Sequence, residues 1–187
     1  MVVTTTDRRD MLTVTRASLL SLRAALLRSG DPNSAVTLQE AGYAGGSALY
    51  ESFKAWLAER SEIGIEELDV DSFQHRASEF FSDHGWGTLH VGTIDDVVAT
   101  LDSPDWGECD LNLGAQQPSC HLTTGMFADL FGRLAGAPVA VLEVECRSAG
   151  QERCRFLVGS PDVMDAVYEE MGRGTDYEAA VKMQIAE

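Results

Sequence analysis

The feature of this chain that most constrains its fold is a pair of cysteines in the stretch VECRSAGQERCRFLV, residues 144–158. Apolar residues lie on both outer sides of the pair, and a short polar segment with a glycine lies between them. This pattern predicts two β-strands joined by a tight connection through residues 148–152. Cys146 and Cys154 would then lie on neighbouring strands, close enough for their side chains to meet.

Two neighbouring cysteines can form a disulfide or bind a metal ion. Proteins of the cytoplasm rarely keep disulfides. The N-terminal stretch MVVTTTDRRDMLTV lacks the apolar segment after a basic start that is typical of a signal peptide. We therefore expect a cytoplasmic protein and favour a metal. A structural zinc ion normally takes four ligands, so two more are needed.

Two candidates for these ligands are close in the sequence. Glu143 stands three residues before Cys146 in an otherwise apolar run, and a buried carboxylate needs a partner or a metal. Cys120 stands at the predicted start of a helix, where the helix dipole favours the thiolate. Glu145 is a weaker candidate for the carboxylate, and buried, inert free cysteines are the alternative to any metal. The predicted tetrahedral zinc site consists of Cys120, Glu143, Cys146 and Cys154.

Hydrophobic periodicity divides the chain into helices followed by strands. Helices are predicted over residues 16–28, 34–59, 70–82, 119–134 and 160–171. Strands are predicted for WGTLHVGTI (86–94), DVVATLD (96–102), ECDLNLG (108–114), PVAVLEVECR (138–147) and CRFLVG (154–159). The third of these carries Cys109, which we expect to be a free thiol. The order predicts an α+β fold in which N-terminal helices precede a small antiparallel sheet with one inserted helix.

Length and charge limit the classes of protein to consider. A chain of 187 residues suits a single domain, which we divide into an N-terminal helical part (1–84), a sheet and metal module (85–160) and a C-terminal helix with its tail (161–187). The net charge is −16, with 14 basic against 30 acidic residues. This balance argues against direct binding of nucleic acid or of an anionic membrane surface. No apolar run approaches the length of a membrane span.

Two stretches of the sequence carry a resemblance to a known family. PSCHLTTG (118–125) and LAGAPVAVLEVECRSAGQERCRFLVG (134–159) resemble the 4-vinyl reductase domain family, with its Pro-x-Cys before a helix, its Glu-x-x-Cys-Arg and its Cys-Arg-Phe. The resemblance is specific over about residues 85–159, and EAGYAGGSALYESF (40–53) is similar to the family's glycine-rich second helix. It implies a fold related to trafficking-complex subunits and haem nitric-oxide sensor domains.

The resemblance also implies a metal. A similar module in phenol- and xylene-responsive bacterial activators holds zinc through a cysteine, a glutamate and two more cysteines, in that order. The intervals between the four candidate ligands here are 23, 3 and 8 residues, which fit that arrangement. A structural zinc ion is therefore the expected cofactor.

A pocket between helices and sheet is the third implication. The candidate lining residues are Tyr43, His84, Trp86, Thr100 and Phe127, although aromatic residues at such spacings often only pack in the core. Thr100 stands where the phenol sensors have a tryptophan, so phenol itself is not the expected ligand. The glycines at 42, 45 and 46 serve either close helix packing or space for a ligand. We expect this segment and Phe127 to border an enclosed apolar cavity.

Two functions from different classes follow. The first is a zinc-stabilised sensor or carrier domain for a hydrophobic, aromatic or tetrapyrrole ligand. The alternative is an enzyme or accessory factor in the reduction of a vinyl group in (bacterio)chlorophyll synthesis, the other branch of the family. The sequence has no G-x-G-x-x-G after a strand and no evident catalytic constellation, which favours binding. An apolar face with Leu19, Leu22 and Leu26 predicts a homodimer, as in related sensors.

Overall fold

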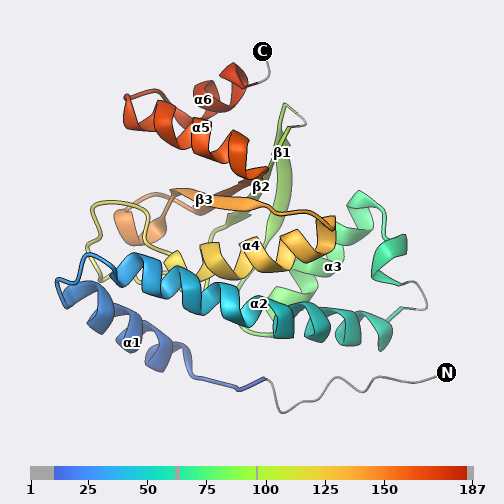
Figure 1. The fold of residues 1–187 in the computed structure, drawn as a ribbon. Coiled ribbons are helices and arrows are strands. Elements are labelled where there is room, and N and C mark those ends of the chain that lie inside the picture. The colour runs from blue at the N-terminus through green and yellow to red at the C-terminus, as the bar shows by residue number, and fades with distance from the viewer. Residues whose placement is uncertain (1–10, 62–63, 96, 185–187) are drawn as a thin grey trace.

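Four antiparallel strands form a sheet that lies between two groups of helices (Figure 1). The computed structural model describes residues 11–61, 64–95 and 97–184. The helices are α1 (Arg16–Arg28), α2 (Ser34–Ala58), α3 (Val70–Asp83), α4 (His121–Ala135), α5 (Pro161–Gly172) and α6 (Tyr177–Met183), with short 3-10 turns at Ile65–Glu67 and Arg147–Ala149. The strands are β1 (His90–Ile94), β2 (Val98–Ser103), β3 (Ala140–Glu145) and β4 (Cys154–Gly159).

The strand order is β1-β2-β4-β3, so β3 is an edge strand and α4 is inserted between β2 and β3 in the chain. The helices α2, α3 and α4 cover one face of the sheet, and α5 and α6 cover the other (Figure 1). The predicted α+β fold, with N-terminal helices and one inserted helix, is thus confirmed. No helix within the described ranges is both long enough and apolar enough to cross a bilayer.

The predicted strand over 108–114 is wrong, because the polar side chains of this segment bind neighbouring backbone groups. The carboxylate of Glu108 accepts hydrogen bonds from Leu122 N and Thr123 N, at 3.1 and 2.8 Å. Asp110 N donates to the hydroxyl of Ser148. The segment is a loop with turns, and Glu108 satisfies two of the free N–H groups at the start of α4.

The closest contact between helices joins α2 and α4 through glycines. A Cβ atom added to Gly42 would lie 1.9 Å from the carbonyl oxygen of Leu122, and one added to Gly125 would lie 1.9 Å from that of Gln39. Gly46 packs in the same way against Asp129. These glycines therefore serve close packing, and the cavity that we expected along residues 42–46 is wrong, because α4 occupies that space.

Substitutions of these glycines test the role of the contact. Gly42→Ala should lower the free energy of unfolding by about 1–3 kcal/mol or more, because the added methyl group meets backbone that cannot move aside. Gly45→Ala on the same helix is the matched control, since no atom lies within 4 Å of the added Cβ. This control should stabilise by up to about 1 kcal/mol. Urea denaturation measures both, and equal effects would contradict the packing role.

Candidate metal centre and the groove beside it

Four potential metal ligands meet between the start of α4 and the β3–β4 hairpin. Cys120 is the N-cap residue of α4, and Glu143 lies in β3. Cys146 directly follows β3, and Cys154 is the first residue of β4. The hairpin predicted from the sequence thus brings its two cysteines together, and α4 adds the third.

The geometry of the cluster is compact and buried. Three Sγ atoms and one carboxylate oxygen all lie within 4.8 Å of one another, and Cys120 Sγ is 3.8 Å from Cys146 Sγ. The three cysteines are fully buried and form no disulfide. Glu143 Oε2 accepts a hydrogen bond of 2.7 Å from Cys120 N, whereas its buried Oε1 has no partner among the described residues. Such a cluster could hold a metal ion.

Burial changes the protonation of the cluster in the metal-free state. Desolvation, with the nearby Cys146, raises the pKa of Glu143 to about 9, so this carboxyl is protonated at neutral pH. Hydrogen bonds from Cys120 and Cys154 hold the pKa of Cys146 far below its ordinary value. Sharing with Cys146 raises the pKa of Cys120, together with burial. The prediction that the helix dipole lowers the pKa of Cys120 is therefore wrong for the metal-free protein.

The neighbours of the cluster settle two smaller questions. Glu145, the weaker ligand candidate, lies outside the cluster, because its carboxylate binds Arg153 at 2.9 Å and the hydroxyl of Tyr177 at 2.6 Å. Cys109 is a buried free thiol, as predicted, and accepts a 3.5 Å hydrogen bond from Ser148. It lies outside the group of four.

The five predicted ligand contacts do not surround one pocket. Trp86 stacks on Trp106, whose ring centroid lies 5.2 Å from that of Phe127, and all three belong to one aromatic cluster between helices and sheet. Thr100 is buried in β2. Tyr43 and His84 are exposed on α2 and at the end of α3. A direct role of these five residues in ligand binding stays a prediction.

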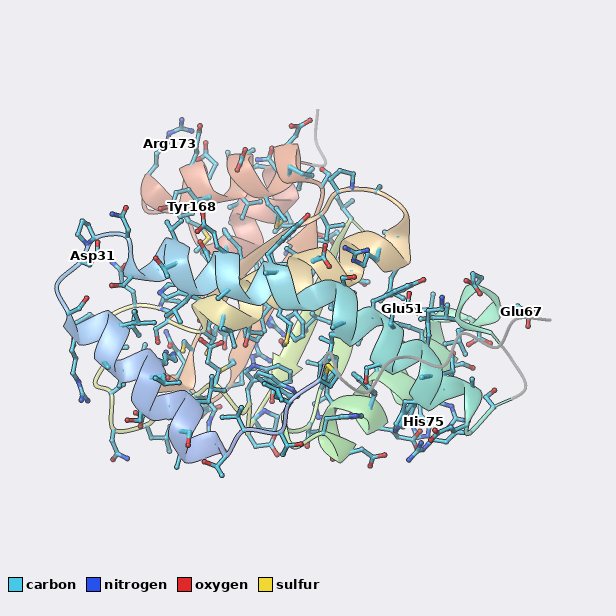
Figure 2. The ribbon with its side chains drawn as sticks, turned by 60° about the horizontal axis from the view of Figure 1, so that its bottom comes forward. Asp31, Glu51, Glu67, His75, Tyr168 and Arg173 are labelled. Carbon is cyan, nitrogen blue, oxygen red and sulfur yellow. The ribbon has the colours of Figure 1, made fainter. Side chains whose placement is uncertain are left out.

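A groove of about 460 Å³, which the sequence did not indicate, lies directly beside the cluster. Glu143 belongs both to its wall and to the cluster. Burial lowers the pKa of His121, another wall residue, so its imidazole is uncharged at neutral pH. Tyr168 extends from α5 on the side of α2 (Figure 2). The wall is formed by Ala35, Gln39, Gln117, Pro118, His121, Thr124, Val141, Leu142, Glu143, Tyr168, Met171 and Gly172.

Comparison with known sequences confirms the family resemblance. Residues 107–160, which include all four members of the cluster, match the family model of the 4-vinyl reductase domain. An uncharacterized protein of Methanocaldococcus jannaschii is 28% identical over 105 residues. This match covers 52% of the chain and 56% of the relative, so the chain spans little more than half of that protein's length.

Solved structures with low sequence identity share the fold. The phenol-responsive sensory domain of the transcription activator PoxR, determined with phenol, aligns over 79% of this chain and 75% of its own, with a TM-score of 0.57 and 19% identity. A vinyl-4-reductase family protein from Methanocaldococcus jannaschii aligns over 80% and 83%, with a TM-score of 0.50 and 15% identity. A trafficking protein particle complex subunit 3 from Naegleria fowleri, covalently bound to palmitic acid, aligns over 77% and 91%, with a TM-score of 0.57 and 12% identity.

The buried carboxyl predicts a pH dependence of the metal-free protein. Because the folded-state pKa of Glu143, about 9, lies above its ordinary value of 4.5, its contribution to stability is present at low pH and is lost as the pH rises through 9. Glu143→Gln, which resembles the protonated form, should remove this loss. Urea unfolding of chelator-treated protein at about pH 5, 7 and 9 measures it. Glu145→Gln is the control that should keep the loss, and an unchanged slope in Glu143→Gln would contradict the prediction.

Proposed function

We propose that this protein is a zinc-stabilised domain that binds a neutral, largely apolar small molecule, as a sensor or a carrier. The observation that carries the proposal is that Glu143 is shared between the cluster of potential metal ligands and the groove. A ligand in the groove would therefore lie against a residue that the metal holds in place.

Zinc is the metal that suits these donors. Three thiols and one carboxylate supply four ligands of the kinds that zinc takes, and thiolates disfavour magnesium and calcium. The partnerless Oε1 of Glu143 marks a buried acceptor for which a cation would compensate. Since the protein supplies all four ligands, the bound ion would contribute folding free energy rather than activate water.

The groove favours a ligand without charge. Its wall combines apolar residues such as Val141, Leu142 and Met171 with the uncharged polar groups of Gln39, Gln117 and Thr124. No lysine or arginine is part of the wall, and the one carboxyl group there belongs to Glu143. A carboxylate or phosphate would therefore be buried without a counter-ion. The volume of about 460 Å³ suits a small organic molecule.

The filled interior supports this location. Aromatic side chains occupy the space between the helices and the sheet, where Phe127 and Phe156 are fully buried with ring centroids 5.4 Å apart. The sensory domain of PoxR, whose fold this chain shares, was determined with phenol. We transfer only the class of small aromatic molecule from that protein and assign it to the groove.

Zinc binding is tested with a pair of cysteine variants. Wild-type protein should retain one zinc ion per chain, and Cys146→Ser should lose it together with its stabilisation, which is about 2.7 kcal/mol at a free zinc concentration of one hundred times the dissociation constant. Cys109→Ser, a change at the buried thiol outside the cluster, should keep the zinc. Elemental analysis and thermal unfolding provide the measurements. A wild-type protein without zinc after purification and reconstitution would exclude the metal.

Ligand binding is tested with two related fluorescent probes. N-phenyl-1-naphthylamine is neutral, and 8-anilino-1-naphthalenesulfonate adds a sulfonate to the same ring system. The neutral probe should bind at least about tenfold more tightly, because the groove offers no cation to the sulfonate. Ala35→Trp, which places a large side chain in the groove, should abolish this binding. Ala41→Trp is the control on the exposed side of the same helix.

The outcomes of this test are distinct. If the neutral probe binds Ala35→Trp as tightly as wild type, the ligand site lies elsewhere and the binding function remains. If no probe or other neutral aromatic compound binds the zinc-loaded protein, the binding function is wrong.

An enzyme or accessory factor in vinyl-group reduction is the second candidate. It is supported by the shared fold with a structure described as a vinyl-4-reductase family protein. Incubation of the purified protein with a chlorophyllide and a defined electron donor tests it. Reduction of the vinyl group would replace the binding proposal, and no turnover would leave it in place.

A further inference from the structure

Helix α1 is attached to the rest of the protein through arginines rather than leucines. Its buried residues are Arg23 and Ala24, whereas Leu22 is 66% exposed. Arg16, at the start of the helix, donates to the carbonyl oxygens of Trp106 and Gly107, each at 3.0 Å. Because these bonds depend on fixed acceptor positions, the docking of α1 depends on the geometry of the backbone beneath it.

Arg23 binds the residue that directly precedes a cluster cysteine. Its Nη2 donates to the carbonyl oxygen and to the hydroxyl of Ser119, both at 2.6 Å. Its Nε donates to Glu108 Oε1 at 3.2 Å, and both partners of this ion pair are fully buried. The guanidinium thus connects α1 with both the loop around Glu108 and the start of α4.

The hydroxyl of Ser119 continues this chain of contacts to the cluster. Ser119 Oγ lies 3.9 Å from Cys146 Sγ. Arginine is only a donor, so Ser119 Oγ accepts from Arg23 and its own proton is free to point at the sulfur. A metal-bound cysteine is a thiolate and has no proton to donate, so in the metal-bound protein the direction Arg23 to Ser119 to Cys146 is fixed.

We propose that Arg23 and Ser119 form an outer shell of the metal centre and couple its occupancy to the docking of α1. The inference rests on the proposed zinc site. Metal binding makes Cys146 a stronger acceptor, which holds Ser119 in the position that Arg23 requires. By reciprocity, docked α1 strengthens metal binding by the same factor. Arg23 and Ser119 are positioning residues in this arrangement.

Ser119→Ala separates this coupling from simple docking. The variant removes the hydroxyl but keeps the carbonyl oxygen that Arg23 also binds. Loss of an outer-shell partner typically weakens metal binding by about 10–100-fold, and we expect a loss within this range. Ser148→Ala is the matched control, because Ser148 is also buried and donates to a thiol, that of Cys109 outside the cluster. The control should bind zinc within about twofold of wild type.

Competition with a chromophoric chelator measures zinc affinity, and the thiolate charge-transfer band of the cobalt-substituted protein reports the sulfur environment. Arg23→Met should weaken zinc binding by about as much as Ser119→Ala, and the double variant should lose little more, because one chain of contacts is broken. If Arg23→Met does not fold, the comparison of Ser119→Ala with Ser148→Ala still decides.

Hydrogen exchange tests the reciprocal effect on α1. Zinc should slow amide exchange over residues 16–28 in wild type by a larger factor than in Ser119→Ala. Amides of α5, which lies on the other face of the sheet, serve as the internal reference (Figure 1). A wild-type protein that binds no metal would overturn the zinc site itself. Equal zinc affinities of wild type and Ser119→Ala, in proteins that both bind metal, would overturn only the coupling.

Discussion

The burial of a carboxyl group among three thiols is the constraint on which the rest of this structure depends. Glu143 comes from β3 and the thiols come from α4 and the hairpin, so the cluster fixes how α4 sits on the sheet. In the metal-free state burial keeps this carboxyl protonated, with a pKa of about 9. A divalent cation would remove that requirement, because it compensates for the negative charge of the ligands where water is excluded. Folding and metal binding are then two descriptions of one equilibrium.

The cluster could be predicted from the sequence because most of its geometry is local. Eight residues separate Cys146 from Cys154, and a hairpin leaves their side chains few arrangements. The ion pair of Arg23 and Glu108 spans 85 residues and could not be predicted in this way. One signal was available: Arg23 stands four residues from both Leu19 and Leu27, on the stripe expected to be buried. The same missing contact explains the wrong strand over 108–114, since Glu108 was treated as a strand residue rather than as a cap for α4.

The ligand pocket failed as a prediction for a different physical reason. Aromatic residues and glycines have two uses, and spacing does not distinguish them. Trp86 and Phe127 fill the interior, and Gly42 and Gly125 bring two helices into contact. The groove, by contrast, is formed by residues from α2, α4, β3 and α5, which only the tertiary fold brings together. Its position at the edge strand explains why three consecutive residues of β3, from Val141 to Glu143, all line it.

The attachment of α1 gives the coupling to the metal centre its consequence. A helix held by buried leucines tolerates small shifts of its support, because apolar contacts are not directional. A helix held by Arg16 and Arg23 does not, since each guanidinium needs its acceptors at hydrogen-bond distance. Leu22 and Leu26 remain on the outer side of the same helix, so the predicted homodimer would use a surface whose position depends on Ser119. A change at the metal centre would therefore reach a surface available for partners through three side chains, without any rearrangement of the sheet.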